Sequence, residues 1–472
     1  MPTTPTTTPF SKQIAFDEAL IRKYDESGPR YTSYPTADRF HNRFTEADYR
    51  KALAARREMT APEPLSVYVH LPFCNTICYY CACNKIITKD HGRSAKYIRY
   101  LAHELELVTS LIEDRDARAL KQLHWGGGTP TFLSHEEMRN LMGHLRKHFT
   151  VTPDAEVSIE VDPRKVDEAT IILLGELGFN RISVGVQDFN PDVQKAINRI
   201  QSEEETLTVI HAARAHGFVS VNIDLIYGLP KQTLAGFAET LDRVISVAPD
   251  RIALYNYAHV PHMAKPQRRI ALEDVPKPED KLRILALAIE KLGDAGYVYI
   301  GMDHFAKPDD ELARAQREGT LHRNFQGYTT HSECDLLAFG ISGIGMVGST
   351  YVQSVRTLDD YYAALDAQKL PVLRGYTLTR DDELRRAVIQ ELMCQFELQP
   401  AKIEARWGIR FDDYFAAERA ALPPLAEDGL IEILPDSIKV TDRGRLLVRT
   451  VAMVFDRHLR EDETQGKYSK VI

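Results

Sequence analysis

Short apolar runs and longer amphipathic stretches alternate regularly along the central part of the chain. The short runs predict strands at 66–71, 123–128, 157–162, 181–187, 221–228 and 251–258. Between them lie stretches with helical periodicity, such as 94–112 and 168–179. Strand–helix units in series predict a parallel sheet with right-handed crossovers, and therefore an α/β fold.

The ends of the predicted strands are rich in glycine and polar residues. Four cysteines follow the first strand and a glycine run ends the second, while the others end at Glu160, Asp162, Gln187, Asp224, Asn256 and Tyr257. The periodicity fits an open twisted sheet as well as a barrel. However, parallel barrels collect functional side chains at the carboxyl ends of their strands. We therefore expect a partial, six-stranded parallel (β/α) barrel.

The rhythm of apolar runs divides the chain into three expected parts. Residues 1–60 form an N-terminal segment with the turn-rich stretch GPRYTSYPTADRF, and residues 61–356 form the barrel, in which 301–356 act as a cap. Residues 357–472 form a smaller helical domain whose helices and short hairpin resemble a winged helix. The many acidic residues of this last part argue against DNA binding.

Composition and charge exclude several classes of protein. The 472 residues carry a net charge of −8, whereas a nucleic-acid-binding protein is expected to be basic. The N-terminus has neither the basic nor the apolar region of a secretory signal. The uncharged stretch 336–355 contains four glycines and reads as buried loop and strand, not as a membrane span. We expect a cytoplasmic monomer with no membrane or nucleic-acid partner.

Four of the six cysteines fall within ten residues, at Cys74, Cys78, Cys81 and Cys83. Such bunching in a large chain without a secretory signal indicates a metal or redox site. Zinc is the alternative, but zinc sites usually pair two short clips that lie some distance apart. Three cysteines in one compact loop can hold a [4Fe–4S] cluster and leave one iron open to another ligand.

The cysteines lie in YVHLPFCNTICYYCACNK, whose CxxxCxxC pattern resembles the radical S-adenosylmethionine (SAM) enzymes. The chain as a whole resembles one branch of these, the oxygen-independent coproporphyrinogen III oxidases. The matching motifs are GPRYTSYPTADRF, HWGGGTPTFL, SIEVDPR, GFNRISVGVQDFN, NIDLIYGLPKQT, GMDHFAKPDDELARAQREGTLHRNFQGYTT and SKVI. The resemblance implies that two propionates of coproporphyrinogen III become vinyl groups, giving protoporphyrinogen IX in haem biosynthesis. The reaction would use a 5′-deoxyadenosyl radical made from SAM at a [4Fe–4S] cluster.

The same resemblance implies a set of site residues. Cys74, Cys78 and Cys81 would be the cluster ligands, and Cys83 would stand outside the permanent ligand set. Two SAM molecules would lie side by side. Contacts to the cluster-bound SAM would come from Tyr68, Gly127, Glu160 and Ile344, of which Tyr68 and Glu160 would also be catalytic. Contacts to the second SAM would come from Tyr80, Gly128, Thr129, Gln187, Arg199, Asp224 and Ala258.

The residue types suit such a ligand independently of the resemblance. Glu160 and Asp224 can accept hydrogen bonds from ribose hydroxyls or an amino group, and Arg199 can pair with a carboxylate. Each polar residue at a strand end, taken singly, is more often a structural hydrogen-bonding group. Six of them on one rim favour a binding site.

The resemblance also implies how substrate and electrons reach the site. Arg30, Tyr31 and Tyr34 in the N-terminal segment would cover the active-site mouth; the alternative is a surface turn with buried tyrosines. The four carboxylates of the porphyrinogen need cationic partners, and the candidates are Arg30, Arg199, Lys231, Arg268 and Arg269. An electron donor such as a flavodoxin or ferredoxin is implied. His70 would support the cluster from behind, whereas His124, His259, His304 and His322 read as structural.

Three other functions compete with this interpretation. A radical-SAM-like haem chaperone would share the cysteine motif, but those relatives lack the PRYTSYPTA segment and the fourth cysteine. A zinc-stabilised winged-helix regulator would be colourless, whereas a [4Fe–4S] protein is brown. The stretch 343–348 fits G-x-G-x-x-G, but the STYVQSVRT after it does not read as a helix, so nicotinamide or flavin binding is disfavoured.

Overall fold

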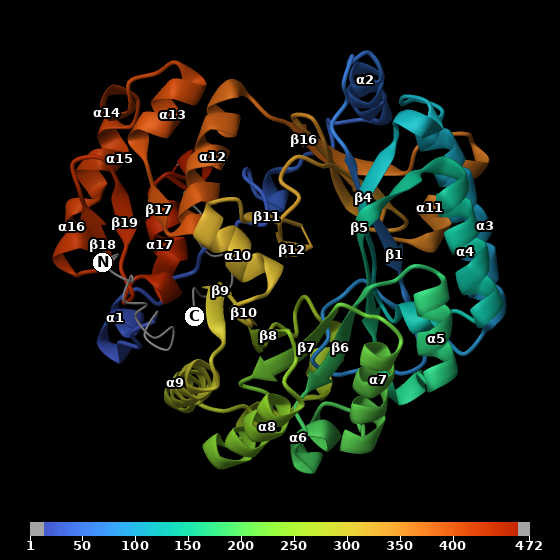
Figure 1. Cartoon of the computed structure of the whole chain (residues 1–472), viewed down its shortest axis with the longest axis horizontal. Helices are drawn as coiled ribbons and strands as arrows, with labels where there is room; N and C mark the ends of the chain where they lie inside the picture. Colours follow the sequence, from blue (N-terminus) through green and yellow to red (C-terminus); the bar gives the residue numbers. More distant parts are fainter. Residues whose placement is uncertain (1–13, 461–472) are drawn as a thin grey trace, which may run out of the picture.

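The computed structural model describes residues 14–460. A twelve-stranded sheet crosses the molecule in the order β16-β15-β14-β13-β1-β4-β5-β6-β7-β8-β10-β9 (Figure 1). The six expected strands are present as β1 (Leu65–Leu71), β4 (Ala119–Gly127), β5 (Thr150–Val161), β6 (Arg181–Gln187), β7 (Ser220–Tyr227) and β8 (Arg251–Asn256). They lie side by side in chain order and pair in parallel, which confirms the α/β class.

The sheet extends well beyond these six strands. One side gains β13 (Asp335–Phe339), parallel to β1, followed by the antiparallel β14 (Ile344–Val347), β15 (Thr350–Ser354) and β16 (Val372–Thr377). The other side gains the antiparallel β10 (His304–Ala306) and β9 (Val298–Gly301). Within the described residues the two end strands, β16 and β9, are not neighbours, so the sheet is open there.

The expected cap over residues 301–356 is therefore wrong for most of its length. Its strands β13, β14 and β15 continue the sheet next to β1. The reason lies in β1, which is buried along nearly its whole length and so needs a hydrogen-bonded strand on each side. The uncharged stretch 336–355 is thus strand and loop, as expected. Its glycine-rich part is a hairpin between β14 and β15 and opens no helix.

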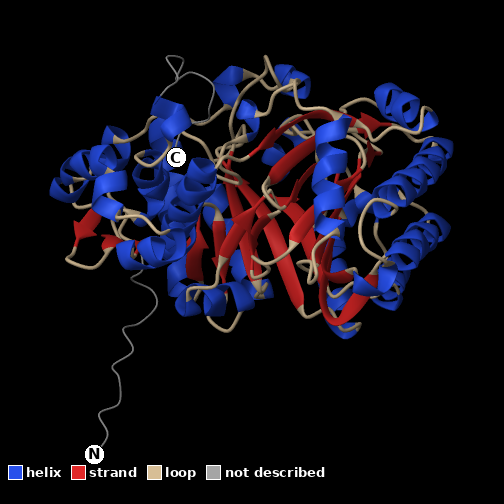
Figure 2. Cartoon of the chain, turned by 90° about the horizontal axis from the view of Figure 1, so that it is seen from above, coloured by secondary structure: helices blue, strands red, loops and turns tan. Residues whose placement is uncertain are grey.

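Helices lie along the outer side of the curved sheet (Figures 1 and 2). They are α3 (His91–Thr109), α4 (His135–His148), α5 (Glu168–Glu176), α6 (Pro191–Ala196), α7 (Glu203–Ala215), α8 (Leu234–Val247) and α9 (Pro278–Asp294). Local sequence sets where they begin. In α4 the Ser134 hydroxyl accepts from the backbone of Glu137, whose carboxylate accepts from the backbone of Ser134. No helix among residues 14–460 is long and apolar enough to span a membrane.

A second, helical region follows the large sheet and lies at the left of Figure 1. It contains α12 (Arg380–Gln395), α13 (Pro400–Trp407), α14 (Phe411–Tyr414), α15 (Ala416–Ala421), α16 (Pro423–Glu427), α17 (Val448–Met453) and α18 (Arg457–Arg460). A small antiparallel sheet joins β17 (Glu397–Leu398), β19 (Ile438–Val440) and β18 (Ile431–Ile433). The expected C-terminal helical region is confirmed. The motif SKVI lies outside the described residues.

Residues 14–60, the described part of the N-terminal segment, join the two regions. The segment contains α1 (Glu18–Lys23) and α2 (Glu46–Arg57). Arg30 pairs with Asp303, which follows β9, while the Tyr31 hydroxyl donates to Asp456 Oδ2 beside α18 at 2.9 Å. Tyr31 and Tyr34 are fully buried. The tyrosines therefore belong to the core between the sheet and the C-terminal helices.

A buried acid, Glu104, connects α3 to the residue that follows β13 and to a later helix. Glu104 is 3% exposed, and its Oε2 accepts hydrogen bonds from the backbone N–H of Gly340 at 2.8 Å and the Tyr361 hydroxyl at 2.6 Å. Gly340 follows β13, and Tyr361 lies in α11 (Leu358–Asp366). Burial raises the pKa of Glu104 to about 7 despite these two hydrogen bonds.

This pKa predicts a pH-dependent stability that a Glu104→Gln variant would lack. Because the folded state binds the proton more tightly than the unfolded state, the stabilisation is complete below about pH 4.5 and is lost as pH rises through about 7. We expect a loss of about 3 kcal/mol in wild type. In the variant the amide oxygen can still accept both hydrogen bonds. Urea unfolding at about pH 5 and about pH 8 measures this. Glu106→Gln, on the exposed face of the same helix, should behave as wild type.

Candidate functional site

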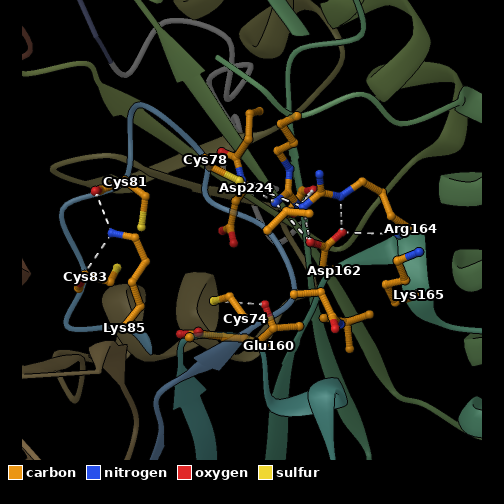
Figure 3. Close-up of a pocket in the computed structure, with 18 of the residues that line it drawn as sticks. Cys74, Cys78, Cys81, Cys83, Lys85, Glu160, Asp162, Arg164, Lys165 and Asp224 are labelled. Carbon is orange, nitrogen blue, oxygen red and sulfur yellow. Dashed lines mark hydrogen bonds and ion pairs between the residues drawn. The ribbon is translucent and has the colours of Figure 1, made fainter. Parts of the chain in front are cut away.

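A cavity of about 570 Å³ lies at the carboxyl ends of the parallel strands (Figure 3). Strands β4 to β8 each contribute to its lining, together with the cysteine-bearing loop. Eleven of the fourteen expected site residues line it: Cys74, Cys78, Tyr80, Cys81, Gly127, Gly128, Thr129, Glu160, Gln187, Arg199 and Asp224. Residues from six separate stretches of the sequence thus meet at one place, as the strand-end pattern predicted.

The cysteine loop begins in β2 (Phe73–Cys74) and returns in β3 (Ile86–Ile87), which pairs with β2. The middle of the loop is fastened to the stretch after α6: the backbone N–H of Tyr79 donates to the Ile197 carbonyl at 2.9 Å, and the Asn198 side chain donates to the Ile77 carbonyl at 2.7 Å. The loop is therefore positioned by tertiary contacts as well as by its own turns.

Each of the first three cysteines has its own donor or cation. The Thr129 hydroxyl lies 3.5 Å from Cys74 Sγ, and Arg199 Nη1 lies 3.7 Å from Cys78 Sγ. A hydrogen bond from Cys83 and the charge of Lys85 lower the pKa of Cys81. Burial raises the pKa of Cys74 to about 11 when nothing is bound. The surroundings of Cys81 favour the thiolate, the form that binds metal.

The spacing of the thiols suits a cluster better than a single zinc ion. The six cysteines are free. Within residues 14–460, the His/Cys/Asp/Glu set whose ligand atoms all lie within 4.8 Å of one another is His331, Glu333 and Cys334. No three of the four clustered thiols meet that limit, although zinc–sulfur bonds of about 2.3 Å require it. A multi-iron cluster spans wider gaps, and three thiolates with one open position match a [4Fe–4S] cluster.

The glycine run at the end of β4 brings backbone directly against the cysteine loop. Gly127 has φ of +112° and donates its N–H to Glu160 Oε2 at 3.0 Å. Gly128 donates to the Leu71 carbonyl at 2.8 Å, and a β-carbon there would lie 2.6 Å from the Pro72 carbonyl carbon. The run is thus a tight turn and also a close approach to the cavity, because both glycines line it.

Two carboxylates face the cavity with pKa values shifted in opposite directions. Burial would raise the pKa of Glu160, but hydrogen bonds from His124 and the Gly127 N–H outweigh it and hold the value below the usual range. Burial and the nearby charge of Glu160 raise the pKa of Asp224 to about 6, although the Ser183 hydroxyl donates to it at 2.9 Å. Glu160 is therefore the anion at neutral pH, and Asp224 titrates just below it.

Arg199 is engaged with the protein itself. It donates to the Gly185 carbonyl at 2.7 Å and to Gln201 Oε1 at 3.1 Å, and it pairs with Asp162 at 3.3 Å. Asp162 also pairs with Arg164 at 2.5 Å, on the side of the cavity opposite Cys81 and Cys83 (Figure 3). Arg199 thus contacts Cys78 Sγ and protein acceptors at once, and these contacts hold its guanidinium in place.

Tyr68 does not line the cavity and instead packs against two histidines behind it. Its hydroxyl and His70 Nδ1 are 3.0 Å apart, and its ring stacks on His124 at 5.9 Å between centroids. His70 in turn bonds the Asn84 carbonyl through Nε2 at 2.9 Å, within the cysteine loop. His70 therefore supports the loop, while His124 reaches Glu160, a role beyond the structural one expected for it.

Ala258 and Ile344 also lie outside the lining. The Gln267 side chain donates to the carbonyls of Ala258, at 3.1 Å, and Tyr80, at 2.9 Å, and so connects Ala258 to the cavity wall. Ile344 packs in a separate apolar cluster with Phe40 and Tyr351. The structure does not bring Ile344 to the cavity described here.

Several lining residues were missed by sequence reasoning. They are Asn75, Thr76, Lys85, Pro130, Val161, Asp162, Arg164, Lys165, Ser183, Gly185, Ile200, Glu205, Ile226 and Tyr255. Lys85 and Arg164 had a usable signal, since each lies within four residues of a predicted site residue, in the cysteine loop and in SIEVDPR. Among the five cations considered for substrate, Arg199 lines the cavity, whereas Lys231 is half exposed and pairs with Asp274.

Comparison with known proteins gives a consistent result. Residues 68–244 match the radical SAM superfamily and residues 378–447 match the HemN C-terminal domain. The chain is 52% identical over 461 residues to the oxygen-independent coproporphyrinogen III oxidase of Pseudomonas aeruginosa, covering 97% of this chain and 99% of that one. The Escherichia coli protein of the same name is 49% identical, covering 98% and 99%. A solved structure of Escherichia coli coproporphyrinogen III oxidase (HemN), described as a radical SAM enzyme, superposes with a TM-score of 0.90 at 48% identity, covering 95% and 100%.

Proposed function

The chain belongs to the oxygen-independent coproporphyrinogen III oxidases, a family of radical SAM enzymes, and we propose that the cavity at the carboxyl ends of β4 to β8 is its active site. The protein catalyses the oxygen-independent oxidative decarboxylation of two propionates of coproporphyrinogen III to vinyl groups in haem biosynthesis. The observation that carries the assignment of the site is the convergence of Cys74, Cys78 and Cys81 on this cavity.

In this proposal the three cysteines hold a [4Fe–4S] cluster. When bound, such a cluster would supply the electron for the reductive cleavage of SAM, and hence the radical chemistry of the family. The chain stabilises the negative charge there with the Thr129 hydroxyl and the guanidinium of Arg199. Burial of Cys74 and Cys78 keeps water away from the reactive centre.

SAM would occupy the space between the glycine turn and the two carboxylates. A volume of about 570 Å³ is in the range of small-molecule sites. We propose that Gly127 and Glu160 face the cluster-bound SAM, with Tyr68 behind them. Ile344 is assigned to the same SAM molecule by the family resemblance, although it packs in a separate apolar cluster. A second SAM would be bound by Tyr80, Gly128, Thr129, Gln187, Arg199, Asp224 and Ala258. Tyr68 and Glu160 are the residues proposed to be catalytic with the cysteines.

The raised pKa of Asp224 predicts a pH-dependent affinity for SAM. SAM carries positive charge, so its affinity should increase as pH rises through about 6 and Asp224 ionises. An Asp224→Asn variant should bind SAM about ten-fold more weakly at pH 8 and should lose the step near pH 6, because the charged acceptor is gone. Calorimetric titration of the cluster-loaded protein with SAM at several pH values measures both. Asp242→Asn, on the exposed surface of α8, is the matched control.

The function is tested by an anaerobic assay of the iron-reconstituted protein with reductant, SAM and coproporphyrinogen III. Mass spectrometry should detect 5′-deoxyadenosine together with the two-vinyl product. Cleavage of SAM without vinyl product would show that another molecule is the substrate. Haem retained on the protein without SAM cleavage would favour the haem chaperone.

We also propose the finer assignments that the sequence suggested. The six parallel strands would act as a partial barrel around the site, and the C-terminal region would be a winged-helix-like domain. The three-part division at 1–60, 61–356 and 357–472 is kept, although β16 lies past the second boundary and still belongs to the large sheet. A cytoplasmic monomer that receives electrons from a flavodoxin or ferredoxin completes the proposal.

A further inference from the structure

A group of three cations, two of them buried and one partly exposed, lies between the sheet and the C-terminal region, apart from the cavity lining. It consists of Arg30 from the N-terminal segment, Arg449 from α17 and Arg323 from β11 (His322–Asn324), which forms a hairpin with β12 (Gly327–Thr329) (Figure 1). Burial and the charge of Arg323 lower the pKa of Arg30. Burial and the charges of Arg30 and Arg323 likewise lower the pKa of Arg449. Three positive charges therefore share one interior region.

Arg323 differs from its two neighbours because its buried N–H groups have no acceptor among the described residues. Arg30 pairs with Asp303, and Arg449 donates to the Gly28 carbonyl at 2.9 Å. Arg323 is 4% exposed, and its Nε and Nη1 are buried without any hydrogen-bond acceptor in the part of the chain that the structure describes. The Arg323 guanidinium stacks on the face of the Tyr328 ring, with Cζ 4.7 Å from the ring centroid.

An unpaired guanidinium in the interior is unfavourable, and a single aromatic face offsets only part of its lost hydration. Buried polar groups without partners are rare in native proteins, and where they persist they mark sites that a ligand completes. An anion suits this position, because two donor nitrogens and a positive charge lack a partner among the described residues. The chain itself supplies none within residues 14–460.

A row of aromatic rings connects Arg323 to the cavity. Tyr255, at the end of β8, lines the cavity, and its ring meets the His304 ring edge-on at 6.0 Å. His304 meets the Tyr328 ring edge-on at 5.5 Å, and Tyr328 lies under Arg323. Burial and the neighbouring arginines lower the pKa of His304 to about 3, so it stays neutral and leaves the positive charge to Arg323 and Arg30.

Resting on the proposed function, we infer that Arg323, with Arg30 beside it, binds a propionate carboxylate of coproporphyrinogen III. A carboxylate oxygen would accept from one of the two donor groups of Arg323 that lack an acceptor, Nε–H or Nη1–H, and the rings of Tyr255 and Tyr328 would face the macrocycle. Arg323 thereby acts as a positioning residue that sets which propionate lies over the SAM site. It was not among the cations that sequence reasoning considered.

The test compares Arg323→Gln and Arg323→Lys with Arg283→Gln, an exposed arginine of α9. Three quantities are measured: KM for coproporphyrinogen III under anaerobic conditions, binding of the fluorescent tetracarboxylate coproporphyrin III, and the melting temperature without ligand. We expect the glutamine variant to show at least a ten-fold increase in KM and in Kd for coproporphyrin III. Its melting temperature should be unchanged or higher, because an unpaired buried charge is removed. The lysine variant should recover part of the affinity, and the Arg283 variant should equal wild type.

Unchanged KM and Kd in the glutamine variant would overturn the inference. A lower melting temperature with reduced kcat at wild-type KM would also overturn it, because that pattern marks a structural role. The binding assay separates this inference from the proposed function. If wild type binds coproporphyrin III through Arg323 but yields no vinyl product, the reaction is wrong and the carboxylate site stands.

Discussion

A Cys78→Ala variant is expected to lose the brown iron–sulfur chromophore, SAM cleavage and vinyl product together. Removal of one of three thiolates leaves an incomplete ligand set, and Arg199 Nη1 then faces a methyl group where it had sulfur at 3.7 Å. Loss of a residue that merely supports a ligand costs about 10–100-fold in activity or metal affinity. Loss of the ligand itself should bring both products to the background of the anaerobic assay, with iron content measured in parallel.

Two cysteine variants serve as controls. Cys334 is half buried just before β13 and outside the cavity lining, so Cys334→Ala should keep the cluster and full activity. Cys83→Ala tests the fourth cysteine of the motif, which donates to Cys81 and stands outside the proposed ligand set; this variant should keep its iron. Retention of the chromophore in Cys78→Ala, or its loss in Cys334→Ala, would contradict the ligand assignment.

A Gly127→Ala variant should be both unstable and unable to bind SAM. Gly127 has φ of +112°, and an added β-carbon would lie 2.5 Å from His70 Nδ1. The ring cannot move aside easily, because Tyr68 and the Asn84 carbonyl hold its two nitrogens. Backbone strain costs about 1–3 kcal/mol and overpacking about 1–3 kcal/mol. We expect the free energy of unfolding to fall by about 2–6 kcal/mol and SAM affinity to fall at least ten-fold.

Gly143→Ala is the matched control for this substitution. Gly143 lies within α4, and an added β-carbon there would meet nothing within 4 Å. Alanine inside a helix is favoured over glycine by about 0.5–1 kcal/mol, so this variant should be slightly more stable and fully active. If the turn is as tight as described, Gly127→Ala should lower both the melting temperature and the affinity for SAM. Gly143→Ala should slightly raise the melting temperature and leave the affinity for SAM unchanged. Equal behaviour would show that Gly127 is not constrained.

The pattern of apolar and polar residues predicted the parts of the fold that depend on short, continuous stretches of the chain. Apolar runs predicted all six central strands, because buried parallel strands are continuous apolar segments, but β4 and β5 begin well before their predicted starts, at Ala119 and Thr150. The pattern did not place β13 beside β1, because Leu65 and its partner Asp335 lie 270 positions apart in the chain and no periodicity records such a pairing. The expected cap failed for this reason.

The residues of the candidate site likewise fall into those that the sequence predicted and those that only the structure identified. Motifs identified the cysteines and the glycine turn, because their chemistry depends on short spacing that the sequence displays. Arg323 and Tyr255 escaped notice, because their roles depend on which side chains lie around them after folding. Arg199 was expected to be free for a ligand carboxylate, and only the structure reveals its pairing with Asp162.

The contacts of the N-terminal segment have a consequence for the order in which the molecule assembles. The partner of the Tyr31 hydroxyl, Asp456, leaves the ribosome 425 positions later, and Tyr34 likewise accepts its hydrogen bond from the backbone of Arg457. Domains fold largely in the order of synthesis, so the sheet can form while these tyrosines still lack their neighbours. The hydroxyls of Tyr31 and Tyr34 thus gain these two partners only after Asp456 and Arg457 have been synthesised, and a premature stop before Asp456 would leave both hydroxyls without them.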